Sequence, residues 1–362
     1  MPAQHSPSGR TVHLSTSGVD ARITPDEFGG FVLEIGGAVQ SHVDLADPAR
    51  IRYEYLRRMA HVLDGVAPAG APVRVLHLGA GALTLPRYLQ ATRPGSEQTV
   101  VDLDRELVSF VLAELPLPAG TDLVSVVADA RLAAVDLAMD GERFDAVVLD
   151  IGTGEEGAEH LRGAVFYGEL LELLTAGGVL LVNIGDDAGL RFLGAELGAL
   201  EEAAAEAGVP GPWTLADQGM LERLDWGNVV LAAGAPLGEA GCTERLAAAG
   251  PHPAAVLDPA ESAALAGIQT KRVLLSVYVV AGLICGLAAW SSIGRVGSIS
   301  PTSFFEANLE SITAVVIGGI SLFGGRGSIV GPLIGALIVG VFNSGLRLAG
   351  VDVLWQLFAT GW

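Results

Sequence analysis

Short apolar runs recur along the first 260 residues, and an acidic or polar residue follows most of them. Apolar runs of this length are typical of buried parallel strands. Segments rich in alanine, leucine and glutamate separate them, with apolar residues at helical spacing. The runs that predict strands lie at 74–78, 99–101, 123–128, 144–149 and 178–183. This alternation predicts an α/β fold in which helices cover both faces of a mostly parallel sheet.

The pattern changes after residue 260, where long stretches without charge replace the alternation. Residues 273–294 carry no charged side chain. As a helix, a stretch of this length is long enough to span a bilayer core of about 30 Å. Residues 311–325 form a shorter apolar run, which predicts a re-entrant or packed segment. Residues 328–346 are again apolar, with glycines that would let helices approach closely: Gly331, Gly335 and Gly340. A buried hairpin of a soluble protein fits this length and glycine content poorly, so we expect transmembrane helices.

Charge divides the chain at the same place. Up to residue 260 it has 37 acidic residues, 16 arginines and no lysine, a net charge of −21, whereas the remainder carries +1. The acidic half would repel a phosphate backbone, so we expect no nucleic-acid partner. Cys242 and Cys285 provide neither a disulfide framework nor zinc spacing, so we expect a reducing cytoplasm and no metal site. The polar N-terminus predicts no secretory signal.

Gly79 and Gly81 follow the predicted strand at 74–78, where they allow a tight backbone turn. About twenty residues later, Asp102 ends the next predicted strand. This spacing is typical of a mononucleotide-binding unit, in which an acid at the tip of the second strand accepts ribose hydroxyls. The third glycine of a dinucleotide fingerprint is absent, which favours the S-adenosylmethionine fold over NAD. A tight turn without any ligand is the alternative.

Several segments, in the same order, resemble the spermidine synthase family over about residues 12–257. They are FVLEIGGAVQ at 31–40, DP at 47–48, YEY at 53–55, HLGAGALTLPRYL at 77–89, VDLD at 101–104, AD at 128–129, Asp150 and FYGEL at 166–170. The resemblance implies an N-terminal β-hairpin followed by a seven-stranded Rossmann-like methyltransferase sheet. It also implies S-adenosylmethionine, or its decarboxylated form, as co-substrate, and it leaves a homodimer open.

The resemblance assigns a role to each matching residue. The expected nucleoside contacts are Gln40, Gly79, Gly81, Asp102 and Asp129. Asp150 takes the place of the acid that deprotonates the attacking amine. Tyr53 and Tyr167 would line the acceptor pocket, although a place in the hydrophobic core is an equal alternative for both.

Two departures from the family pattern concern the amine side of the site. Ala82 stands where the family has an aspartate in its glycine loop, and Thr153 stands where it has a second acid after the catalytic one. Charged nitrogens need carboxylate partners when they lose water. We therefore expect an intact nucleoside side and an altered acceptor side. Aminopropyl transfer, methylation of another acceptor and nucleoside binding without catalysis all stay open.

Asp150 carries the expected chemistry, because a carboxylate at the carboxyl end of a central strand faces the crevice and can deprotonate an acceptor nitrogen. A sulfonium is already a good leaving group, so modest base assistance and positioning suffice. The alternative is that Asp150 caps the following loop. His160 is expected to be a solvated loop residue, and His77, inside a strand, a core residue.

The tail resembles the permease subunit of ribose- and xylose-type ABC sugar importers. The matching segments are ESAALAGIQTKRV at 261–273, AVVIGGISLFGGRGS at 314–328 and DVLWQ at 352–356. The resemblance covers about a third of such a subunit and implies contact with an ABC ATPase through residues 260–272. A gene fusion and a chimeric reading frame, joined near 251–261, both stay open.

Three domains follow from these patterns: residues 1–60 as the hairpin region and linker helix, 61–258 as the nucleoside-binding domain, and 259–362 as a partial permease region. Lys271 and Arg272 precede the first apolar span and Arg295 follows it. Basic residues favour the cytoplasmic face. We therefore expect a multi-pass inner-membrane protein, in contact with lipid, whose N-terminal domain is cytoplasmic.

Overall fold

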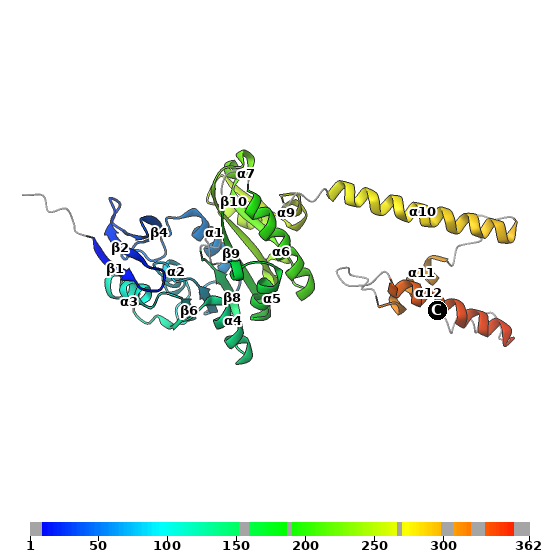
Figure 1. The fold of residues 1–362 in the computed structure, drawn as a ribbon, viewed down its shortest axis with the longest axis horizontal. Coiled ribbons are helices and arrows are strands. Elements are labelled where there is room, and N and C mark those ends of the chain that lie inside the picture. Colours follow the sequence, from blue (N-terminus) through cyan, green and yellow to red (C-terminus); the bar gives the residue numbers. More distant parts are fainter. Residues whose placement is uncertain are drawn as a thin grey trace, which may run out of the picture. The chain divides into compact units, whose positions relative to one another are not determined.

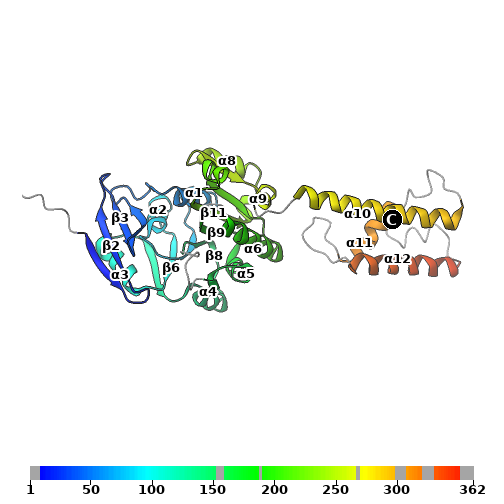
Figure 2. The ribbon, with the colours of Figure 1, turned by 45° about the horizontal axis from the view of Figure 1, so that its top comes forward.

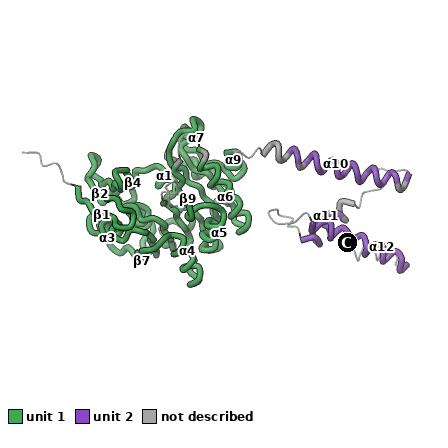
Figure 3. Tube along the Cα trace, viewed as in Figure 1, with its two compact units in different colours: residues 1–270 green, residues 271–362 purple. Residues whose placement is uncertain are grey.

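The computed structural model describes residues 9–151, 159–186, 190–265, 270–297, 307–319 and 330–350. The chain divides into two compact units, residues 1–270 and residues 271–362 (Figure 3). The first unit contains two β-sheets and the helices that cover them, and the described residues of the second unit form helices and the turns that end them. Each unit is described by itself.

A four-stranded antiparallel sheet forms the N-terminal part of the first unit (Figure 1). Its strands follow chain order and are β1 (Arg10–Leu14), β2 (Val19–Pro25), β3 (Phe31–Ile35) and β4 (Ala38–Val43). The expected hairpin is β3–β4, whose turn residues Gly36 and Gly37 both have positive φ angles, as a tight hairpin turn requires. The hairpin is thus half of a larger sheet, since β2 pairs with β3 through five residue pairs.

The main sheet has eight strands, in the order β12-β10-β11-β9-β8-β5-β6-β7. The parallel strands are β5 (Arg74–Leu78), β6 (Glu97–Asp102), β7 (Asp122–Val127), β8 (Phe144–Leu149) and β9 (Leu174–Asp186). The antiparallel strands are β10 (Trp213–Asp217), β11 (Gly227–Gly234) and β12 (Ala254–Leu257). The five predicted strands are the five parallel ones, and the expected count of seven was wrong because β12 adds an edge strand beyond β10.

Helices cover both faces of the main sheet (Figures 1 and 2). One apolar core contains residues of α4 (Ala130–Met139), α5 (Ala164–Glu172) and α6 (Arg191–Ala207). The core on the opposite face contains residues of α1 (Glu54–Leu63), α2 (Thr84–Thr92) and α8 (Cys242–Ala249). Successive residues of the central strands alternate between these cores: Leu76 belongs to the first and Val75 to the second. The predicted layering is therefore confirmed. A third core joins the N-terminal sheet to α3 (Arg105–Glu114).

The first unit extends beyond the predicted domain end at residue 258, because α9 (Pro259–Leu265) packs on it. Asp258 and Glu261 exchange hydrogen bonds, each side chain accepting from the other residue's backbone N–H at 2.9 and 3.2 Å, which begins the helix. Ser262 is fully buried, and its hydroxyl lies 2.9 Å from that of Thr214 in β10. The strand β12 and the helix α9 thus belong to the α/β unit.

The second unit contains α10 (Thr270–Val296), α11 (Ala307–Ile317) and α12 (Val330–Leu348). By length and composition α12 could cross a membrane, whereas Tyr278–Gly294 in α10 is a shorter apolar stretch. A Cβ on Gly335 would lie 1.9 Å from the carbonyl oxygen of Ala314, so glycine lets α11 and α12 approach closely. Gly340 has open space around it and serves no such contact. The stretches 320–329 and 352–356 lie outside the described residues.

Candidate functional site

A cavity of about 1100 Å³ opens at the carboxyl ends of the central parallel strands. The strand β5 lies between β8 and β6, and the chain leaves β5 toward β6 and later returns to β8 on the other side. Such a reversal of strand order leaves a crevice where ligands bind in open α/β sheets. The predicted site residues that line the cavity are Gln40, Tyr53, Gly79, Gly81, Asp102 and Asp150.

The turn after β5 requires glycine at two places. Gly79 has φ +100°, and a Cβ there would lie 2.3 Å from the backbone carbonyl oxygen of Asp150. Gly81 has φ +47°, and a Cβ there would lie 2.7 Å from the Ser41 hydroxyl. Neither space nor backbone conformation admits a side chain easily. The turn therefore brings β4, β5 and β8 together around the cavity.

Asp102, at the end of β6, fixes the shape of this turn. One carboxylate oxygen accepts a hydrogen bond from the Ala80 N–H at 2.9 Å, and the other accepts from the Asp104 N–H at 2.9 Å. Burial raises the pKa of the Asp102 carboxyl, and these two backbone bonds oppose the rise. Each oxygen retains a second lone pair, so the carboxylate can also accept bonds from a ligand hydroxyl.

Asp150 follows β8 and lies on the other side of the glycine turn. Its carboxylate accepts a hydrogen bond from the Asn183 amide at 2.8 Å and a longer one from the Tyr55 hydroxyl at 3.3 Å. Burial raises the pKa of Asp150, while both bonds lower it. Burial and the nearby carboxylate raise the pKa of Tyr55, so Tyr55 stays a hydroxyl donor. The arrangement holds Asp150 in a fixed orientation at the cavity wall.

Sequence reasoning missed the roles of Tyr55 and Asn183. Tyr55 stands two residues after Tyr53 in the recognised YEY motif, but the motif does not show which ring reaches the acid. Asn183 lies in β9, the neighbour of β8. Since parallel strands end at the same edge of a sheet, the polar residue closing the fifth predicted run was a usable signal.

The part of the cavity beyond Asp150 carries charges of both signs. Its lining includes Glu54, Arg58, Asp217, Arg223, Asp225, Trp226 and Asn228. Arg58 is buried and donates to Glu54 at 3.2 Å through both terminal nitrogens. Burial lowers the pKa of Arg58, and Glu54 opposes this. Apart from Glu54, which belongs to the YEY motif, no sequence motif pointed to these residues, because they come from α1, from β10 and β11 and from the segment between these two strands.

Asp129 and Tyr167 do not line the cavity. Asp129 caps α4 by accepting from the N–H groups of Arg131 and Leu132, and its other oxygen lies 2.7 Å from the ring of His160. Tyr167 is fully buried, and its hydroxyl donates to Glu196 at 2.5 Å. The structure therefore places Tyr167 in the core, which was its alternative location.

The two histidines singled out from the sequence, His77 and His160, lie outside the lining of the large cavity, and each contacts a polar side chain. His77 is buried in β5 and bonds to Gln98 at 3.1 Å, and burial lowers its pKa to about 4, so its expected core position is confirmed. His160 is half-exposed. Thr153 and the rest of 152–158 lie outside the described residues. Within the described ranges, no three His, Cys, Asp or Glu side chains are grouped closely enough to hold a metal ion.

A solved structure shares the fold of the first unit. The crystal structure of a probable spermidine synthase from Corynebacterium glutamicum matches with a TM-score of 0.60 and 24% sequence identity, over 72% of this chain and 94% of that chain. A likeness at this identity shows the fold. The four-stranded sheet and the larger mixed sheet thus form a spermidine synthase-like fold.

The C-terminal part is similar to permeases. A family model described as a branched-chain amino acid transport system/permease component matches residues 248–361. A fructose import permease protein of Rhizobium meliloti is 60% identical over 142 residues, 39% of this chain and 33% of the relative. A ribose import permease protein of Bacillus subtilis is 46% identical over 101 residues, 28% and 31% of the two chains. The chain spans about a third of the length of these relatives. It therefore joins a spermidine synthase-like fold to a sugar-permease-like segment.

Proposed function

We propose that the first unit binds S-adenosylmethionine, or its decarboxylated form, and transfers an alkyl group from the sulfonium to an acceptor. The observation that carries this proposal is the position of the glycine turn between two strand-end carboxylates, Asp102 and Asp150, in one cavity. Gln40 would lie over the nucleoside, and Asp102 would accept the ribose hydroxyls. Asp129 remains an adenine contact only by resemblance, since it lies outside the cavity lining.

The reaction would break a carbon–sulfur bond and form a bond between that carbon and an acceptor nitrogen. The bonding pair leaves with sulfur, which becomes a neutral thioether, and the acceptor proton passes to Asp150. Asn183 and Tyr55 would keep the carboxylate aimed at the acceptor, and Tyr53 would line the acceptor's path. General-base help of this kind contributes typically 10²–10⁴-fold.

Calorimetry with methylthioadenosine tests the nucleoside claim on the full chain in detergent. Gln40 is exposed at the cavity wall, so Gln40→Ala should weaken binding without unfolding the protein. Asp136→Ala, an exposed position on α4, is the matched control and should bind as the wild type does. Absence of binding to the wild type would refute the proposal. Binding without transfer from either donor to any amine would leave a non-catalytic nucleoside-binding domain.

We also propose that the second unit anchors the chain in the inner membrane. The support is the permease match together with α12, which is long and apolar enough to span. The full chain should sediment with membranes and resist carbonate extraction, and its first unit should be digestible only in inside-out vesicles. Recovery of the full chain in the cytosolic fraction would contradict this.

A permease role is the competing proposal, favoured by the identity of the tail to sugar import permeases. It requires an ABC ATPase that docks on residues 260–272. Ser262 in α9 is buried against the first unit, so the beginning of that segment is already occupied by an internal contact. Copurification of an ATPase in detergent, with sugar uptake dependent on the gene, would support transport. Failure of both would leave the tail as an anchor.

A further inference from the structure

A second cavity, of about 500 Å³, lies apart from the candidate active site and is rich in basic side chains. We call it the basic pocket, and the residues that define it are His42, Arg50, Arg52, Arg57, His61 and Tyr88. Asp44 is the one acid among its described lining residues. The first 260 residues contain 37 acids and 16 arginines, so three arginines against Asp44 and the neighbouring Asp26 reverse the local balance.

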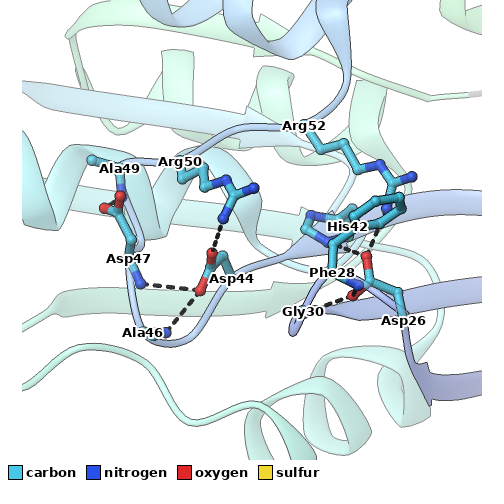
Figure 4. A network of polar contacts seen from close by, with 10 residues as sticks. All are labelled: Asp26, Phe28, Gly30, His42, Asp44, Ala46, Asp47, Ala49, Arg50 and Arg52. Carbon is cyan, nitrogen blue, oxygen red and sulfur yellow. Dashed lines mark hydrogen bonds and ion pairs between the residues drawn. The ribbon is translucent and has the colours of Figure 1, made fainter.

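One wall of the pocket fixes the guanidinium of Arg52 (Figure 4). Asp26 accepts from Arg52 at 2.6 Å and lies 2.9 Å from His42, and its other oxygen accepts from two backbone N–H groups. The guanidinium carbon of Arg52 lies 4.4 Å from the centre of the Phe28 ring. Stacking and one ion pair thus hold the group in place, and among the described residues this pair uses one terminal nitrogen, so other N–H groups of the guanidinium can donate to a ligand.

A second acid positions Arg50 in the same way (Figure 4). Asp44 accepts from Arg50 at 3.3 Å through one oxygen, and the other accepts from the backbone N–H groups of Ala46 and Asp47. The side chain of Asp44 is buried, whereas that of Arg50 is 62% exposed. One oxygen of Asp44 is therefore held by the turn and the other by Arg50, whose described hydrogen bond uses one terminal nitrogen, so its other N–H groups can donate to a ligand.

Arg57, on α1, differs from Arg50 and Arg52 in its ion pairing. It is half-buried and lines the pocket, and no carboxylate among the described residues lies within ion-pair distance of it. A half-buried guanidinium forms stronger hydrogen bonds to an anion than a fully solvated one does, and its planar arrangement of N–H groups matches the oxygens of a phosphate.

We propose that the basic pocket binds a phosphate group, either free or carried by a small metabolite, with Arg57 as its main ligand and Arg50 and Arg52 beside it. Three guanidiniums around one space suit an anion with more than one negative charge. Asp26 and Asp44 act by positioning two of them.

The pocket shares two elements with the candidate active site. On α1, Tyr53, Glu54 and Tyr55 line the large cavity, whereas Arg57 lines the basic pocket. On β4, Ser41 faces the large cavity and His42 the basic pocket. A bound phosphate would therefore contact α1, the helix that carries Tyr55. Tyr55 in turn donates a hydrogen bond to Asp150 in the large cavity.

Phosphorus NMR on the full chain in detergent tests the proposal with two probes, inorganic phosphate and glycerol 3-phosphate, at constant ionic strength set with chloride. Binding should broaden the probe signal, and the tighter probe identifies whether the phosphate is free or esterified. Arg57→Gln should weaken binding roughly tenfold or more, as loss of a charge-assisted hydrogen bond does. Arg57→Lys should restore part of it. Arg22→Gln, at an exposed position on β2, is the control and should bind as the wild type does.

Arg50→Gln, at an exposed side chain, provides a second test should Arg57→Gln fail to fold. No broadening with the wild type, or equal binding by Arg57→Gln and the control, would overturn the proposal. Displacement of the phosphate by methylthioadenosine would also overturn it, because that result places the anion in the large cavity. Since neither probe is a nucleoside, phosphate binding can succeed or fail independently of nucleoside binding.

Discussion

Replacing Gly79 by alanine tests whether the glycine turn and the end of β8 are in contact. The new Cβ would lie 2.3 Å from the carbonyl oxygen of Asp150, far inside the 3.0 Å that real Cβ atoms keep. The turn, the Asp150 backbone or both must move. In addition, φ +100° is a conformation that side chains with a Cβ rarely adopt.

The two costs can be separated with Gly70→Ala as a control. Gly70 also has a positive φ, +75°, but nothing lies within 4 Å of its Cβ position. We expect Gly70→Ala to lose about 1 kcal/mol of unfolding free energy from backbone strain alone. Gly79→Ala should lose about 2 kcal/mol more, since forcing an extra methyl group into a packed site typically costs about 1–3 kcal/mol.

Urea unfolding of the three full-length proteins in one detergent, followed by circular dichroism, measures the difference. If Gly79→Ala loses no more than Gly70→Ala, the close approach of β5 and β8 is wrong. The geometry inferred for the whole cavity would then fail, because Asp102 and Asp150 are placed relative to each other by this turn.

Three further outcomes follow from the described contacts. Tyr55→Phe removes a bond that lowers the pKa of Asp150, so that pKa should rise further above its ordinary value. Because the pKa of Asp150 is higher in the folded state than in the unfolded state, the free energy of unfolding falls as pH rises from the ordinary carboxyl range to the raised pKa. Urea titrations at several pH values should show a larger fall in this free energy for Tyr55→Phe than for the wild type. Tyr167→Phe should lose about 1–3 kcal/mol, because buried Glu196 would keep only a longer bond from the Gly163 N–H at 3.4 Å in place of the Tyr167 donor among the described contacts, yet the variant should bind methylthioadenosine in calorimetry as the wild type does. Ending the chain at residue 258 removes α9 and should lower the melting temperature relative to ending it at 270, whereas equal melting temperatures would contradict the packing of α9.

The strands and the turn could be predicted because their signals are local. A buried parallel strand is a continuous apolar run, and all five such runs became β5 to β9. Gly79 and Gly81 could be predicted because few other residues adopt their φ angles. The acids at strand ends were found for the same reason, since Asp102 and Asp150 directly follow apolar runs.

The remaining site depends on contacts that sequence spacing does not encode. Arg58 and Asp217 are far apart in the chain and line one cavity only after α1 packs near β10. Asp129 could have been identified as a helix cap, since aspartate before an alanine-rich helix is a common N-cap. The sequence could not decide whether Tyr167 lies in the acceptor pocket or in the core, because Glu196, its hydrogen-bond partner, is on another helix.

The location of β12 has a consequence for where the two halves of this chain can be divided. The permease family model matches from residue 248, so its match includes β12, which pairs with β10 at the edge of the α/β sheet. A chain cut at residue 248 would expose β10 as an unpaired edge, and such edges are prone to pair with other chains and aggregate. Any division that keeps the α/β sheet intact must therefore leave β12 with the first unit.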